Sequence, residues 1–164
     1  MTASNGEVQN GRSAFDFLIG RWNIRHRRLQ ESLKGSTSWE EFEGMAVDRY
    51  ILGGLGSISE VTLQLASGPV EGMTVRLFDP RAEQWSIYWV SNMNGILTTP
   101  MIGGFKQGRG AFYAHENIGG KHIFSRFLWS DITTTSCHWE QAFSEDGGST
   151  WETNWVMDLT RQQE

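Results

Sequence analysis

The sequence predicts an all-β protein, a barrel or sandwich of about ten antiparallel strands. Three observations point to this class. Apolar and polar residues alternate through most of the chain, clusters of Gly, Pro, Asn and Asp recur at roughly regular spacing, and no long amphipathic helix interrupts the pattern. Regularly spaced short strands separated by turn signals are typical of β-sandwiches and β-barrels.

The first half of the chain begins with a polar lead, residues 1–13, which we expect to be flexible. Residues 14–20 predict a short helical turn that caps one end of the sheet structure. Gly44 predicts a bulge or bend inside the second strand. The strands of this half are expected at 22–28, 39–50 and 57–65, with a glycine-rich turn at 51–56.

The second half contains two strong hairpin signals. Residues 73–78 and 85–90 flank a turn that starts with Asp79 and Pro80, where Pro presets φ and Asp caps the bend. Residues 92–105 contain Pro and several Gly and predict a long loop with short strand pieces. Two further strands are expected at 110–116 and 121–129.

The most aromatic hairpin is at the end of the chain, where two alternating runs flank the Asp- and Gly-rich turn 145–150. A bend at Gly147 would place Trp139 opposite Trp155 and Phe143 opposite Trp151. Trp139, Gln141 and Trp155 would then form a wall of aromatic and amide groups, either packed as core or lining a pocket.

Bulk properties limit the function classes. The 164 residues fit one domain, expected at 14–162, and the single cysteine excludes an intrachain disulfide. Residues 1–13 lack the apolar segment of a signal peptide, and no run reaches the ~18 apolar residues of a membrane helix. We therefore expect a cytoplasmic protein without a membrane partner. The net charge of −5 argues against a nucleic-acid partner.

Several motifs together resemble a known family. They are Phe-Asp-Phe-Leu-Ile-Gly-Arg-Trp at 15–22, Leu-Phe-Asp-Pro at 77–80, Gln-Trp-Ser-Ile-Tyr-Trp at 84–89, Phe-x-Trp-Ser at 127–130, Trp-Glu-Gln-Ala-Phe-Ser-x-Asp-Gly-Gly at 139–148 and Thr-Trp-Glu-x-Asn-Trp at 150–155. The chain resembles the bacterial domain-of-unknown-function 1579 family over residues 14–161. This resemblance implies an up-and-down calycin-like barrel, akin to lipocalins, in which Trp22 closes one end. The family has no settled activity.

Alternation along the first strand identifies the first candidate site residues. If Trp22 points inward, His26 and Arg28 point inward too, because side chains alternate across a strand. Charged groups inside an apolar wall must be paired or serve a ligand. Glu41 and Glu43 share a face of the next strand and are natural partners for Arg28. The alternative is that His26 and Arg28 lie where the barrel opens to water.

Two further arginines lie within apolar strands. Arg76 and Arg126 would anchor a carboxylate or phosphate if they point inward, whereas alternation could equally expose them. Tyr88 would share a face with Arg76 in one register of the hairpin but not in the next.

Metal and cofactor signals are weak. His115, Glu116 and His122 flank a short turn, but their spacing matches no known metal signature. No metal and no cofactor is therefore predicted. Some calycin-like barrels hold haem through one His, so haem stays as an alternative implied by the resemblance.

Three functions stay open. The favoured hypothesis is a small-molecule-binding barrel for an apolar or aromatic ligand with an anionic group, held by His26 and by Arg28, Arg76 or Arg126. The second is an enzyme, an isomerase, cyclase or hydrolase, in which His26 or Glu43 acts as acid–base. The third is an interaction module that forms a homodimer through an exposed edge strand or the loop at 93–105.

Overall fold

A computed structural model describes residues 11–163, and they form a closed ten-stranded antiparallel barrel. The prediction of an all-β barrel is confirmed. The elements are η1 (Asp16–Leu18), β1 (Gly20–Leu29), β2 (Trp39–Ile51), η2 (Leu52–Gly54), β3 (Gly56–Leu65), β4 (Gly68–Asp79), β5 (Gln84–Ser91), β6 (Met101–Lys106), β7 (Arg109–Ile118), β8 (Lys121–Ser130), β9 (Ser136–Ser144) and β10 (Glu152–Arg161).

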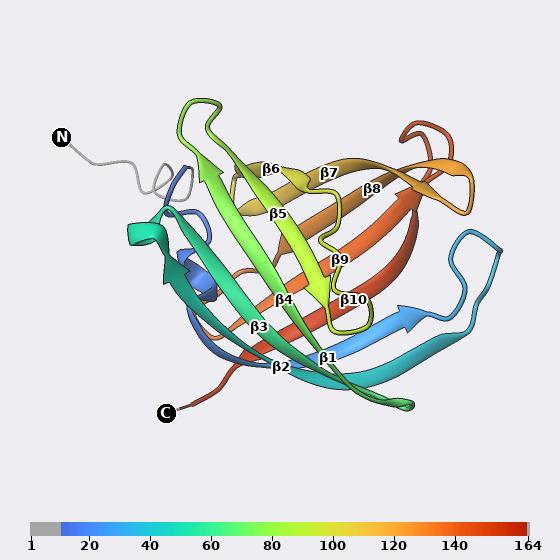
Figure 1. Ribbon diagram of the computed structural model, residues 1–164, viewed down its shortest axis with the longest axis horizontal. Coiled ribbons are helices and arrows are strands. Elements are labelled where there is room, and N and C mark those ends of the chain that lie inside the picture. Colours follow the sequence, from blue (N-terminus) through green and yellow to red (C-terminus); the bar gives the residue numbers. More distant parts are fainter. Residues whose placement is uncertain (1–10, 164) are drawn as a thin grey trace.

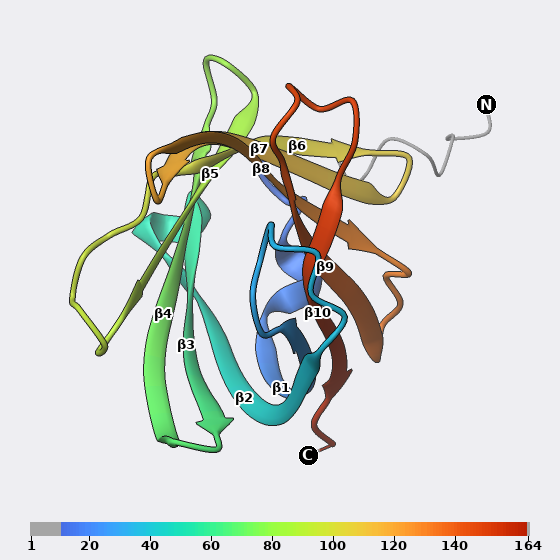
Figure 2. The same cartoon turned by 90° about the vertical axis from the view of Figure 1, so that its right-hand side faces the viewer.

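Each strand pairs with its neighbours in the sequence, and β1 closes the barrel by pairing with β10 (Figure 1). The closing register extends from Trp22 opposite Arg161 to Arg28 opposite Trp155. The short helix η1 lies at one end of the barrel, which we call the plugged end. The β1–β2, β7–β8 and β9–β10 connections lie at the other, which we call the loop end (Figures 1 and 2).

The plugged end is held by the sequence Gly20-Arg21-Trp22. The Trp22 indole is fully buried, and its Nε1 donates to the Leu18 carbonyl at 2.8 Å. From β10, the Arg161 guanidinium stacks over the Trp22 ring at 4.4 Å and donates to the carbonyls of Phe17 and Ile19, both at 2.6 Å. Gly20 has a φ of +124°, and a Cβ there would meet Arg161 Nη1 at 2.5 Å, so only glycine fits.

Aromatic side chains fill the space behind this plug. Phe15 packs edge-on against Trp85 at 5.0 Å and against Phe105 at 4.9 Å, and it stacks on Phe112 at 5.6 Å. All four are buried. Such contacts add to the large apolar area that aromatic residues bury. The expected helical cap at 14–20 is thus present as η1 and its flanking residues.

Residues 1–10 of the expected lead lie outside the described residues. The next two residues are attached to the barrel, because the Gly11 carbonyl accepts from Trp85 Nε1 at 3.1 Å and Arg12 donates to the Gly53 carbonyl at 2.9 Å. Within residues 11–163 no helix is long and apolar enough to cross a membrane.

The long loop expected at 92–105 contains a short strand, β6, as predicted. Two local expectations differ from the structure. The strand expected from residue 73 begins at Gly68. Gly44 causes no bulge, because β2 keeps an unbroken register with both neighbours. A Cβ at Gly44 would lie 2.8 Å from His26 Nε2, so the missing side chain makes room for the imidazole instead.

The register of the C-terminal hairpin is also corrected. Trp139 faces Met157 and Gln141 faces Trp155, instead of the expected Trp139–Trp155 pair. A register shift between Thr153 and Trp155 leaves one extra residue in β10, which is a β-bulge. The bulge moves the remaining inward side chains of β10 along β9, a change that alternation alone cannot predict.

Candidate ligand-binding cavity

A cavity of about 170 Å³ lies inside the barrel, and side chains from all ten strands, from η1 and from the β5–β6 loop line it. An apolar cavity of roughly 150 Å³ can take up a benzene-sized molecule. Most of the lining is apolar, with aromatic rings from β5, β8, β9 and β10. These rings belong to Trp89, Phe127, Trp129, Trp139 and Trp155.

The floor of the cavity, towards the plugged end, carries a buried ion pair. Arg76 Nη1 donates to Asp48 Oδ2 at 3.1 Å and to Ser59 Oγ at 2.7 Å. The guanidinium also lies over the Phe15 and Trp129 rings, at 5.2 and 5.9 Å. Arg76 therefore points inward, and its neighbours on β2 and β3 neutralise it.

Burial works against both charges of this pair. Burial raises the pKa of Asp48, while the adjacent guanidinium opposes the rise. Burial likewise lowers the pKa of Arg76, and Asp48 opposes that change. Because the ordinary pKa of arginine is so high, Arg76 keeps its proton.

Two N–H groups at the floor have no hydrogen-bond acceptor within the described part of the chain. They are Arg76 Nε and the indole Nε1 of Trp129, and both are buried. Buried donors normally have a partner, so these two leave unused hydrogen-bonding capacity among the residues of the floor.

His26 lies higher in the barrel, nearer the loop end, and lines the cavity with a side chain that is almost fully buried. Its ring stacks on Phe42 at 4.6 Å, and its Nδ1 accepts a hydrogen bond from Trp155 Nε1 at 3.0 Å. The neutral tautomer therefore carries its proton on Nε2, which has no partner among residues 11–163. Burial, aided by the charge of Arg28, lowers the pKa of His26 to about 4.

Arg28 lies at the loop end of β1, beside the cavity and not within its lining. Its Nε donates to Glu40 Oε1 at 2.8 Å, and its guanidinium covers the Phe42 and Trp155 rings at 5.3 and 4.9 Å. Its partner is Glu40, so the expected pairing with Glu41 or Glu43 is wrong. Glu40 and not its neighbours shares the inner face with Phe42, since side chains alternate.

Besides Arg28, three predicted site residues do not line the cavity. Glu43 is exposed on the outer face, opposite Arg25. Tyr88 pairs with Val75, one position away from the Arg76–Ile87 pair, and therefore points outward. The expectation that these two line the cavity is wrong, because the register places each on the outer face of its strand.

Arg126 is the third. Its guanidinium stacks on the Trp151 ring at 4.2 Å, and it pairs with Tyr113 of β7, whose side chain is exposed. Inward residues of β8 are Ser125 and Phe127, so alternation places Arg126 outside. Its expected role inside the barrel is therefore wrong.

The aromatic wall of the C-terminal hairpin does line the cavity. Trp139, Gln141 and Trp155 all face it, with the two indole rings edge-to-face at 6.1 Å. The Gln141 amide donates to Asn154 Oδ1 at 2.8 Å, which ties the wall to the bulge in β10.

Sequence reasoning missed Asp48, Ser59 and the pair Glu116–Ser125 as cavity residues. Ser125 Oγ donates to Glu116 Oε2, and both side chains face the cavity. Alternation could have identified this pair, because residues two apart on a strand share a face. Ser125 lies two residues before Phe127, and Glu116 lies two residues after Ala114.

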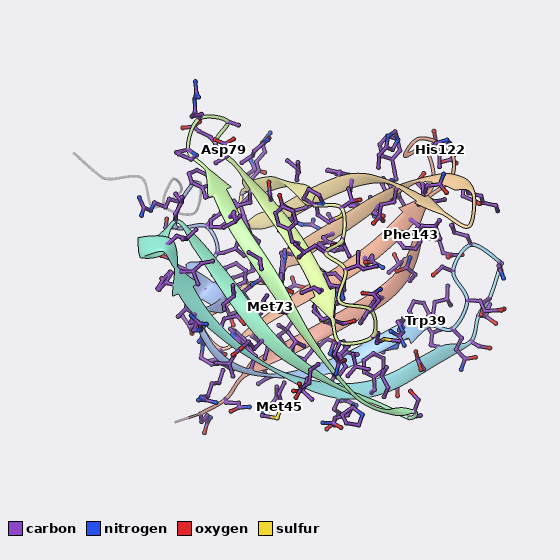
Figure 3. The ribbon with its side chains drawn as sticks, viewed as in Figure 1. Trp39, Met45, Met73, Asp79, His122 and Phe143 are labelled. Atoms are coloured by element: carbon purple, nitrogen blue, oxygen red, sulfur yellow. The ribbon has the colours of Figure 1, made fainter. Side chains whose placement is uncertain are left out.

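The three residues considered as metal ligands, His115, Glu116 and His122, do not share one site. His115 stacks on Phe124 on the outer face at 4.1 Å, whereas Glu116 points into the barrel. His122 pairs with Asn117 and is exposed near the β7–β8 turn (Figure 3). Among residues 11–163 no group of three or more His, Cys, Asp and Glu side chains could hold a metal ion.

Comparison with known proteins adds little. No protein-family model matches the chain. No curated protein matches it either. A solved structure described as "Structure of EF1p2_mFAP2b bound to DFHBI" is similar, with 12% sequence identity over 92% of this chain and 98% of that chain and a TM-score of 0.48. A likeness this distant carries no argument about function, and kinship with the domain-of-unknown-function 1579 family stays a prediction.

Proposed function

We propose that this protein binds a small apolar or aromatic molecule inside its barrel, with an acceptor oxygen of that molecule directed at Arg76. The observation that carries the proposal is the cavity of about 170 Å³, which has aromatic walls and a charged group at its floor. Ligand sites typically combine an apolar lining with a few placed polar groups.

The floor determines what the polar end of the ligand should be. Arg76 Nε and Trp129 Nε1 both offer hydrogens without acceptors within the described residues. A carbonyl, phenol or carboxylate oxygen would accept them. Because Asp48 already neutralises Arg76, a neutral acceptor binds there without leaving an extra buried charge, whereas the anionic group expected from the sequence must overcome the nearby carboxylate.

The enzyme alternative is less well supported. An acid–base role for His26 needs a carboxylate or substrate group beside a free basic nitrogen. Its basic Nδ1 accepts from Trp155, and no carboxylate among residues 11–163 hydrogen-bonds to the ring. Glu43, the other expected acid–base residue, lies on the outer face.

The binding proposal is tested by titration with aromatic probes. Calorimetry and tryptophan fluorescence would follow 2-acetylnaphthalene, 2-naphthoate and unsubstituted naphthalene. Val61→Trp fills the cavity from β3, so we expect probe affinity to fall at least about tenfold. Val47→Trp adds the same side chain to the outer face of β2 and should change affinity by less than about twofold.

Circular dichroism would verify that both variants fold, and Ala46→Leu offers a smaller filling substitution at the same cavity. Equal affinity of the inner-face and outer-face variants would overturn the proposal, as would failure of the wild type to bind any of the three probes. For the floor, the double variant Arg76→Gln/Asp48→Asn should lose the preference for oxygen-bearing probes over naphthalene, whereas Arg126→Gln should keep it.

A second candidate function is self-association. The loop between β5 and β6 exposes three apolar side chains, Met93 at 73%, Ile96 at 67% and Leu97 at 57%. Clustered exposed apolar side chains favour protein contacts. Light scattering of wild type and of a variant with serine at these three positions should show a dimer only for the wild type; a wild-type monomer would exclude this candidate.

A further inference from the structure

Glu116 is a carboxylate inside the barrel that has no cationic partner in the described part of the chain. It lines the cavity from β7, and its one hydrogen bond comes from the hydroxyl of Ser125. The other carboxylates in or beside the cavity are both paired, Asp48 with Arg76 and Glu40 with Arg28. Glu116 is partly buried, so its carboxylate faces the cavity without a protein cation beside it.

The cavity as a whole is consequently negative. Asp48 and Glu116 contribute two negative charges to its lining, and Arg76 contributes one positive charge. His26 adds none at neutral pH, because burial lowers the pKa of its imidazole to about 4. One net negative charge remains, and it belongs to Glu116, in the half of the barrel nearer the loop end.

Aromatic rings line the strands next to Glu116. Phe127 follows Ser125 by two residues on the inner face of β8, and its ring meets Trp139 of β9 at 4.9 Å. Trp139 in turn meets Trp155 of β10 at 6.1 Å. Strands β7 to β10 lie side by side (Figures 1 and 2). Phe127 is therefore on the strand next to Glu116, and Trp139 and Trp155 continue the aromatic lining on the two strands beyond it.

Such a wall has the chemistry of a cation site for an organic ammonium group. The faces of tryptophan and phenylalanine rings attract cations, and ammonium ligands are recognised by aromatic cages. A metal ion would need several hard or nitrogen ligands, and no such cluster exists among residues 11–163. An alkylammonium group needs only the rings and one carboxylate.

We propose that Glu116, with the Phe127 ring on the neighbouring strand, binds the ammonium group of an aromatic or apolar amine. This inference rests on the proposed binding function and deepens it. The ligand class becomes a small molecule that carries both an ammonium group, bound at Glu116 towards the loop end, and an acceptor oxygen, bound at Arg76 on the cavity floor.

The test compares two probes that differ only in the group that Glu116 would recognise. 2-Naphthylmethylamine is protonated at pH 7, and 2-naphthalenemethanol is its neutral counterpart of nearly equal shape. We expect wild-type protein to bind the amine at least about tenfold more tightly than the alcohol, as measured by calorimetry. Glu116→Gln should remove this preference and leave alcohol binding unchanged.

Glu43→Gln is the matched control, because Glu43 occupies a strand of the same barrel but faces solvent. It should retain the full amine preference. An amine bound no better than the alcohol by wild type would overturn the inference without any variant, so a misfolded Glu116→Gln leaves the test valid. Retention of the preference in a folded Glu116→Gln would overturn it too. If neither probe binds, the binding function itself fails; if the alcohol alone binds well, only the role of Glu116 fails.

Discussion

The two halves of the barrel use similar residues in different ways. At the plugged end, the Trp22 indole donates to a backbone carbonyl and lies under Arg161, whose own donors reach three backbone carbonyls, those of Phe17, Ile19 and Thr134. Around the cavity, Trp139 and Trp155 face an open space, and nearer the loop end a histidine and a glutamate have unused hydrogen-bonding capacity.

This difference separates stability from binding. Side chains that pack on all sides and satisfy their polar atoms within the chain contribute to folding. Side chains that line a void lose packing contacts, and their polar groups stay available for another molecule. Substitutions in the plugged half should therefore cause the larger loss of stability. Substitutions among the cavity-lining residues should cause a smaller loss of stability but a larger loss of ligand binding.

The largest effect should come from Trp22→Ala at the plugged end. Removal of a fully buried indole leaves a cavity and deletes the stacking partner of Arg161, so we expect a loss of about 3–5 kcal/mol in the free energy of unfolding. Urea unfolding monitored by circular dichroism measures this loss. Trp89→Ala, at a half-buried ring that lines the cavity, should cost no more than about half as much. Equal losses would show that the two halves do not differ.

The sequence predicted the fold well because its signals are local. Alternation identified most strands, and the Asp79–Pro80 turn forms as expected, with Asp79 Oδ1 accepting from the backbone N–H groups of Arg81 and Ala82 at 2.8 and 3.2 Å. The inward orientation of His26 followed from Trp22 by counting along one strand.

The site was harder to predict because it depends on register between strands. Arg76 and Arg126 occupy similar apolar sequences, yet one is buried with Asp48 and the other stacks on Trp151 outside the barrel. Local sequence cannot distinguish them, because a shift of one residue moves a side chain to the opposite face. The bulge at Asn154 is likewise a feature of strand pairing, and the Asn154 side chain accepts a hydrogen bond from Gln141 on the neighbouring strand.

A smaller effect, specific to the cavity, should appear in the pH dependence of stability. Burial lowers the pKa of His26 from 6.5 to about 4, so between these values the unfolded chain binds more protons than the folded one. Stability should therefore fall as pH falls through this window, by up to about 3 kcal/mol in total. His26→Gln should remove this share of the decline, as measured by urea unfolding from pH 7 to pH 4. An identical decline in both proteins would show that the imidazole titrates normally.

The smallest effect should come from His138, on the outer face of β9. Its contribution to the pH dependence of stability should be opposite in sign to that of His26. His138 Nδ1 is 2.7 Å from Asp158 Oδ1 and its Nε2 is 3.1 Å from Glu140 Oε2. Burial alone would lower the pKa of His138, but the hydrogen bonds to these two carboxylates outweigh burial and raise it. The protonated imidazole thus stabilises the folded chain below the ordinary histidine pKa, and this contribution disappears as pH rises through the raised value.

Because His138 and Asp158 are accessible to solvent, the contribution should stay below about 1 kcal/mol and weaken in high salt. His138→Gln should lose stability relative to wild type at pH 5 but much less at pH 8. A His26→Gln/His138→Gln variant should show both changes independently, since one ring is inside the wall and the other outside. Non-additive effects of the two substitutions would mean that the charge of one histidine influences the other across the barrel wall. The outer face and the cavity would then not be energetically independent.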